Sequence, residues 1–125
     1  LRNSLLPRSK LEEVKIELNR KDDGSEFLDL DWTSSQNILF IPSEMIEHIS
    51  MEDLPRVCGI AFVKRSYFSM GIVIAHEGYL IDRNLLIHAS SNEKRTVKVD
   101  FFDYYFNESG PAFDGIMIYE LHKKI

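Results

Sequence analysis

The four histidines are the residues of this chain whose type and surroundings best suit catalysis. His88 lies inside an apolar run, so it is either a satisfied core histidine or a site residue. His76 follows a continuous apolar segment and opens a turn. His48 and His122 lie in polar surroundings, and we expect both to face solvent. Because histidine titrates near neutral pH, it is recruited readily for proton transfer. The sequence leaves both interpretations of His88 open.

Metal, cofactor and thiol chemistry find little support in the sequence. No histidine pair has the spacing of a helical metal site, and no acid cluster supplies a set of ligands. A glycine-rich phosphate loop is missing as well, so we expect neither a metal nor a cofactor. The single cysteine, Cys58, cannot form an internal disulfide. Its apolar context predicts a buried small hydrophobe, because a reactive thiolate needs a helix N-terminus or a positive neighbour.

Composition restricts the class of protein. A length of 125 residues allows one domain, and a hydrophobic fraction of 44% is enough for a packed core. The formal charge of −5 argues against a nucleic-acid partner, which usually meets a basic face. We also expect no membrane span, because no apolar run approaches the roughly 20 residues that a spanning helix needs.

The chain divides by pattern into a lead segment, 1–35, and a β-rich part. The lead segment is polar. Ser9 and Glu12 have the form of a capping box, and apolar residues recur at helical spacing as far as Leu18. These features predict a helix over about residues 9–20, followed by an extended stretch.

The β-rich part, 36–125, consists of short apolar or alternating segments separated by turn residues. Its close strand spacing favours a small antiparallel sheet curled into a barrel, with one or two short helices, and hence the α+β class. The predicted strands are 37–41, 58–63, 70–75, 79–81, 85–89, 97–101 and 115–119, with helical turns at 43–49 and 103–106 and a turn at Glu77-Gly78.

Several of these segments also resemble, in order and spacing, the C-terminal half of a bacterial family. The segments are 38–42, 58–63, 68–73, 86–91, 97–99, 103–105 and 114–119. The most specific is Leu86–Ser91, with the sequence LIHASS. The family is the N-acetylmuramoyl-L-alanine amidase-like family, a branch of the NlpC-type, papain-like cysteine peptidases. The resemblance implies that residues 36–125 are the barrel half of a papain-like fold, and it extends little into the lead segment.

The resemblance also implies a mechanism and roles. In such enzymes a cysteine at a helix N-terminus attacks an amide carbonyl, a histidine on a barrel strand acts as base, and a third polar residue orients that histidine. His88 matches the orienting residue. Ser69 replaces the expected base, and a serine hydroxyl cannot act as a base near pH 7. In a shifted register His76 would be the base instead. Cys58 matches a barrel strand, so the nucleophile is missing.

We therefore expect the C-terminal part of a degenerate cell-wall amidase or peptidase-like domain. The chain begins at Leu1 without an initiator methionine or a signal-peptide pattern, and we expect it to be part of a larger domain. One alternative is an active cysteine hydrolase whose cysteine lies upstream of Leu1. The other is a non-catalytic binding domain. The resemblance points to a peptide or muropeptide substrate and to the bacterial cell envelope, the periplasm or secretion. The sequence carries no signal of oligomeric state.

Overall fold

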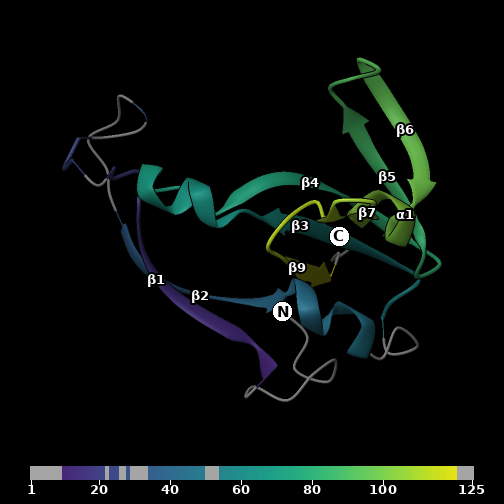
Figure 1. Cartoon of the computed structure of the whole chain (residues 1–125), viewed down its shortest axis with the longest axis horizontal. Helices are drawn as coiled ribbons and strands as arrows, with labels where there is room; N and C mark the ends of the chain where they lie inside the picture. Colours follow the sequence, from purple (N-terminus) through teal and green to yellow (C-terminus); the bar gives the residue numbers. More distant parts are fainter. Residues whose placement is uncertain (1–9, 22, 26–27, 29–33, 50–53, 121–125) are drawn as a thin grey trace, which may run out of the picture.

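The computed structural model describes residues 10–21, 23–25, 28, 34–49 and 54–120. Its main feature is a seven-stranded sheet with the strand order β1-β2-β9-β3-β4-β5-β6 (Figure 1). Every neighbouring pair in this sheet is antiparallel. The strands of the main sheet are Glu12–Leu18 (β1), Ser34–Pro42 (β2), Val57–Val63 (β3), Ile74–Ile81 (β4), Leu85–Ser90 (β5), Arg95–Asp100 (β6) and Gly115–Glu120 (β9).

Short elements complete the described structure. Two 3-10 helices and one α-helix lie between the strands, and two very short strands pair with each other as a separate ladder. These elements are Ser43–His48 (η2), Arg65–Met70 (η4), Phe101–Tyr105 (α1), Phe106–Asn107 (β7) and Gly110–Pro111 (β8). Within the described residues, none of the helices has the length and apolar character needed to cross a membrane.

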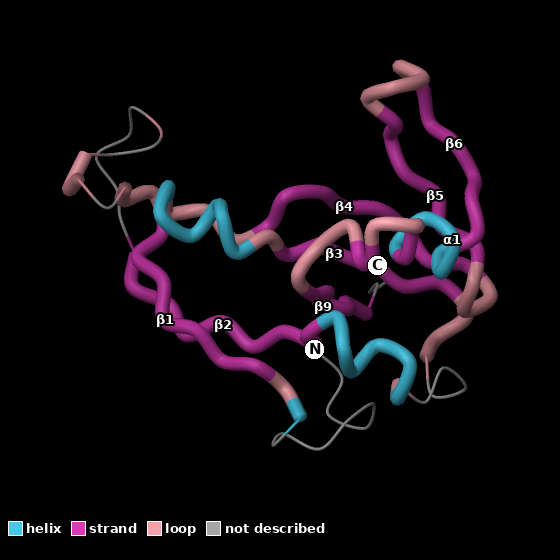
Figure 2. The backbone as a smooth tube through the Cα atoms, in the orientation of Figure 1, coloured by secondary structure: helices cyan, strands magenta, loops and turns pink. Residues whose placement is uncertain are grey.

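The predicted class is confirmed, and the predicted closure is not. The molecule is an antiparallel sheet with a few short helices, as the α+β prediction requires. Among the described strands, however, β1 and β6 end the sheet and do not pair with each other, so the sheet stays open (Figure 2). Residue 35, the predicted boundary between the two parts of the chain, lies inside β2.

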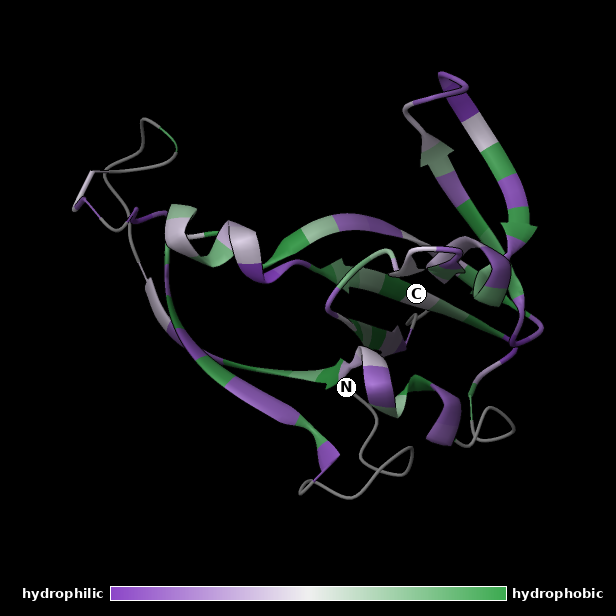
Figure 3. Ribbon diagram, in the orientation of Figure 1, coloured by the Kyte–Doolittle hydropathy of each residue, from purple (hydrophilic) through white to green (hydrophobic). Residues whose placement is uncertain are grey.

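The predicted helix over 9–20 is wrong, because this segment contains strand β1. Val14, Ile16 and Leu18 turn toward the protein while the intervening residues are exposed, which is the alternation of a half-buried strand. Figure 3 shows the alternation as bands of colour along β1. A ladder of seven residue pairs with β2 satisfies the backbone of β1, and this long-range pairing outweighs local helix propensity. Most of the predicted extended stretch, 28–32, lies outside the described residues.

The predicted strand over 70–75 is also wrong. Most of the family-like segment 68–73 belongs to η4 and to the turn that ends it at Gly71. Gly71 has a φ of 76°, and a Cβ there would lie 2.4 Å from the backbone nitrogen of Arg20, so only glycine fits. The strand starts later, at Ile74, and runs through the predicted Glu77-Gly78 turn without a break.

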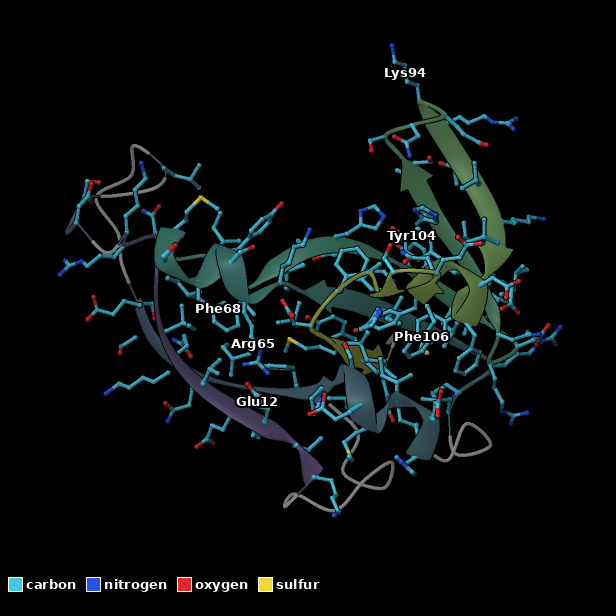
Figure 4. All side chains as sticks on the ribbon, viewed as in Figure 1. Glu12, Arg65, Phe68, Lys94, Tyr104 and Phe106 are labelled. Carbon is cyan, nitrogen blue, oxygen red and sulfur yellow. The ribbon has the colours of Figure 1, made fainter. Side chains whose placement is uncertain are left out.

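Two apolar clusters hold the sheet together. The larger lies between the central strands and the short helices, around Phe62, Tyr105 and Ile46. The smaller joins β1 and β2 to β3 and to the segment after η4, through Ile16, Phe40, Val63 and Val73. Glu12 on β1 forms an ion pair with Arg65 on η4, and their side chains point toward each other across the edge of the smaller cluster (Figure 4).

Candidate functional site

Two of the histidines singled out in the sequence are in direct contact. In the β4–β5 ladder Gly78 lies opposite His88, and His76 is two residues before Gly78 on the same strand. Because side chains on a strand alternate between faces, His76 and His88 share one face of the sheet. The Nε2 atom of His76 lies 2.8 Å from Nδ1 of His88. This is hydrogen-bonding distance, so the two imidazoles form a pair.

The contact defines how the two rings can share a proton. A hydrogen bond between two ring nitrogens needs a proton on one of them. When Nε2 of His76 donates to Nδ1 of His88, the Nδ1 atom of His76 keeps its lone pair. Such a His76 can accept a proton at Nδ1 while His88 holds its ring in place. The pair therefore has the geometry of a general base and an orienting partner.

Aromatic rings surround the pair on the side of the larger core. The His76 ring stacks on Phe62, with 5.8 Å between the ring centroids. Tyr104 packs against His88 at 4.5 Å and lies 6.4 Å from His76. These contacts restrict ring rotation, which matters because a proton is transferred efficiently only between groups in a set geometry.

Burial also affects the protonation of His76. His88 is only 7% exposed. The pKa of His76 is held below its ordinary value of 6.5, chiefly because burial disfavours the charged ring and secondarily because of the neighbouring His88, while Glu77 acts in the opposite direction. His76 is therefore neutral at pH 7, the state that a general base requires.

A cavity of about 390 Å³ opens beside the two imidazoles. A second cavity, of about 640 Å³, shares His88 and Tyr104 with the first and runs along the β5–β6 hairpin. This hairpin projects from the body of the molecule (Figure 1). A ligand thus has access to the histidine pair from the side of the hairpin. The smaller cavity is lined by Lys64, Tyr67, Ala75, His76, His88, Ala89, Ser90, Ser91, Asn92, Tyr104 and Phe113.

Ser69, the residue at the expected position of the base, lies elsewhere. It is on η4, and its hydroxyl donates to the backbone oxygen of Ser66 at 3.5 Å. It is not among the residues that line the cavities beside His88. The structure therefore places His88 in contact with His76, the residue that the sequence analysis gave as the alternative base. Ser69 lies outside the candidate site.

The remaining candidates also lie outside the site. Cys58 is fully buried in the larger core. It pairs with Leu80, whereas Phe62 pairs with His76, so four residues of strand, roughly 13 Å, separate Cys58 from the level of His76. His48 ends η2, and His122 lies outside the described residues. Among the residues that the structure describes, no group of three or more histidine, cysteine or acidic side chains could hold a metal ion.

Sequence reasoning missed the aromatic partners of the histidines. Nothing in the sequence singles out Tyr104 or Phe62 as a partner of the histidines, because only the tertiary structure brings α1 and β3 beside β4. One signal for the pair itself was present. His76, Gly78 and Leu80 alternate as one face of a strand, and this pattern would have placed His76 on the face that meets His88.

Comparison with known proteins gives a likeness of fold. No family model matches the chain, and no curated protein matches it significantly. A similar solved structure is the crystal structure of protein LPG0564 from Legionella pneumophila str. Philadelphia 1, labelled with the family model DUF1460. It has a TM-score of 0.61 and 19% sequence identity over 87% of this chain. The chain spans 50% of the length of that protein, and at this identity the likeness concerns the fold alone.

Proposed function

We propose that this chain supplies the base-bearing part of a cysteine amidase or peptidase of the papain-like kind. The observation that carries the proposal is the 2.8 Å contact between Nε2 of His76 and Nδ1 of His88 beside an open cavity. In this proposal His76 is the general base and His88 orients it. An inactive domain was expected because Ser69 stands at the position of the base. With His76 in contact with His88, a base is available without Ser69.

The nucleophile in this proposal comes from sequence outside these 125 residues, because Cys58 is buried away from His76. Likeness to a structure of which this chain spans 50% is compatible with such a missing part. The incoming cysteine would face Nδ1 of His76, the nitrogen that the His88 contact leaves available. Neutral His76 takes the proton of the thiol, and the imidazolium formed in this step stabilises the thiolate beside it.

The reaction then follows from these positions. The thiolate attacks the amide carbonyl, the carbon–nitrogen bond breaks, and the protonated His76 gives its proton to the departing amine. Water, deprotonated by the same nitrogen, attacks the thioester. The carbon–sulfur bond breaks, a carboxylic acid leaves, and the thiolate is restored. We propose peptidoglycan-type peptides as the substrates, on the basis of the family resemblance of the Leu86–Ser91 segment.

The test uses the complete natural gene product with whatever sequence flanks this chain. Amide hydrolysis is measured by mass spectrometry on muropeptides and on N-acylated dipeptides. We expect His76→Ala to lower kcat by about 10²–10⁴-fold, the usual contribution of a general base, and His88→Ala to lower it less. His48→Ala is the matched control and should leave kcat unchanged.

Three outcomes would contradict the proposal. The first is full turnover by His76→Ala. The second is a complete gene product in which Cys58 is still the only cysteine. The third is a wild-type protein that binds muropeptides in calorimetry but never cleaves them, which would favour the alternative of a binding domain.

A further inference from the structure

Two consecutive tyrosines on α1 have different surroundings. Tyr105 is fully buried, and its hydroxyl lies 2.8 Å from Oγ of Ser43. Tyr104 is half-buried and lines the cavities of about 390 and 640 Å³ together with His88. Within the described residues, the Tyr104 hydroxyl makes no hydrogen bond to the protein. A tyrosine hydroxyl near a protein interior usually has a partner, so the Tyr104 hydroxyl has a donor to offer to a ligand.

The backbone and the neighbouring rings hold Tyr104 in place. The Asp100 side chain caps α1 by accepting a hydrogen bond from the backbone N–H of Asp103 at 3.0 Å. This cap starts α1 directly after β6 and places Tyr104 at the base of the β5–β6 hairpin (Figure 4). The rings of Phe62 and Phe113 lie 5.7 and 6.2 Å from the Tyr104 ring. A ring fixed in this way holds its hydroxyl ready for a ligand, with little ordering needed on binding.

The chemistry of the hydroxyl suits a carbonyl oxygen. Burial raises the pKa of Tyr104 above its ordinary value of 10, so the phenol stays protonated throughout the neutral range. A protonated phenol donates one hydrogen bond. In amide hydrolysis negative charge develops on the carbonyl oxygen, and a positioned donor stabilises that charge in the transition state. His76 and Tyr104 line the same cavity of about 390 Å³. An amide that is attacked beside His76 would therefore occupy a cavity that Tyr104 also lines.

We propose that the Tyr104 hydroxyl donates a hydrogen bond to the carbonyl oxygen of the scissile amide, which makes Tyr104 a catalytic residue beside the His76–His88 pair. This inference rests on the proposed function and adds the residue that stabilises the oxyanion. The substrate class follows as well. It is an amide whose carbonyl oxygen can accept a hydrogen bond from the Tyr104 hydroxyl in the plane of the amide. N-acyl and peptide bonds are of this kind.

The experiment compares Tyr104→Phe with Tyr79→Phe in the complete gene product. Both variants lose one hydroxyl and keep the ring, and Tyr79 is 53% exposed and pairs with Ile87, on the sheet face opposite to His88. We expect Tyr104→Phe to lower kcat about 100-fold, the effect of losing one oxyanion donor, with KM changed less than about threefold. Tyr79→Phe should match the wild type.

A second measurement separates catalysis from packing. A peptide aldehyde adds to the cysteine and forms a tetrahedral adduct, whereas the matching peptide amide binds as a ground state. We expect Tyr104→Phe to weaken binding of the aldehyde by about tenfold or more and to leave binding of the amide unchanged. If Tyr104→Phe keeps full kcat and full affinity for the aldehyde, while His76→Ala is inactive, this inference is overturned and the proposed function stands. If His76→Ala is itself fully active, the proposed function fails first.

Discussion

Gly78 lies directly opposite His88 in the β4–β5 ladder, and a Cβ atom at Gly78 would lie 2.7 Å from the backbone oxygen of Ile87 and 3.1 Å from Cβ of His88. A side chain at this position would therefore push β5 away from β4. Since His76 is two residues from Gly78, the missing side chain lets the two strands approach closely enough for the imidazoles to meet. The spacing His-x-Gly on β4 is thus part of the geometry of the candidate site.

Replacing Gly78 by alanine should disturb this contact. We expect Gly78→Ala to lower the free energy of unfolding by about 1–3 kcal/mol, because the added methyl overpacks the ladder. The His76–His88 hydrogen bond should lengthen as the strands separate. Nitrogen NMR of the imidazoles, recorded on the 125-residue chain, reports the bond directly. A variant with unchanged imidazole shifts and unchanged stability would show that the strands can adapt to the methyl group.

The titration of His76 should be shifted in a set direction. We expect NMR titration to give His76 a pKa below 6.5, because burial and the neighbouring His88 both disfavour its charged form. In His88→Ala the neighbouring imidazole is gone and water has better access, so the pKa of His76 should rise toward 6.5. A His76 that titrates above 6.5 in the wild type would contradict the neutral base of the proposed mechanism.

The same shift predicts how stability depends on pH. Well above pH 6.5 His76 is neutral in both the folded and the unfolded chain, so its titration has no effect on stability there. As the pH falls through 6.5, His76 becomes protonated in the unfolded chain but stays neutral in the folded chain. The free energy of unfolding therefore decreases as the pH falls. Urea unfolding at pH 8, 7, 6 and 5.5 should show this decrease. In His76→Gln the decrease should be smaller, and equal slopes in the two proteins would argue against a depressed pKa.

Ser43 links η2 to two distant parts of the chain. Its hydroxyl donates to the backbone oxygen of Phe113 at 2.7 Å and accepts from the Tyr105 hydroxyl at 2.8 Å. Burial, only partly opposed by this hydrogen bond, raises the pKa of Tyr105 to about 12. We expect Ser43→Ala to cost about 1–3 kcal/mol in urea unfolding, because the buried Tyr105 hydroxyl and the half-buried Phe113 carbonyl both lose their partner. Tyr105→Phe should lower the free energy of unfolding less than Ser43→Ala does, since Ser43 keeps its bond to Phe113. A larger loss in Tyr105→Phe would contradict this assignment of the hydrogen bonds.

Phe40 belongs to the smaller core, and its replacement tests the packing there. It is fully buried, its ring meets Phe68 edge-on at 6.5 Å, and the Arg65 guanidinium lies 5.4 Å from its centre. We expect Phe40→Ala to lower the free energy of unfolding by about 3–5 kcal/mol, because the cavity left behind refills only in part. Val57→Ala, at a position that is 42% exposed, is the control and should change stability by less than about 0.5 kcal/mol. Similar losses in the two variants would show that Phe40 does not anchor this core.

Local pattern was sufficient to predict most of the central sheet. Strands β3, β5, β6 and β9 lie close to their predicted positions, because each is a short apolar or alternating run bounded by turn residues. The helical turns after Pro42 and around Tyr104 were also predicted within a few residues. Pattern reasoning failed at β1, where both helical and alternating spacing were present and pairing with β2 decided between them.

The sequence by itself singled out His76 and His88 as candidates for the chemistry, placed Ser69 at the position of the expected base, and predicted that Cys58 would be buried. Only the tertiary structure decided which of them meet. Contact between His76 and His88 depends on the register of two strands, and a shift of one residue would turn either ring to the opposite face. That register follows from the tight turn at Asp82 and Arg83, which joins β4 to β5, and from the close strand packing at Gly78. His76 and His88 are 12 residues apart on neighbouring strands, and their spacing along the chain does not by itself show which face of each strand they occupy.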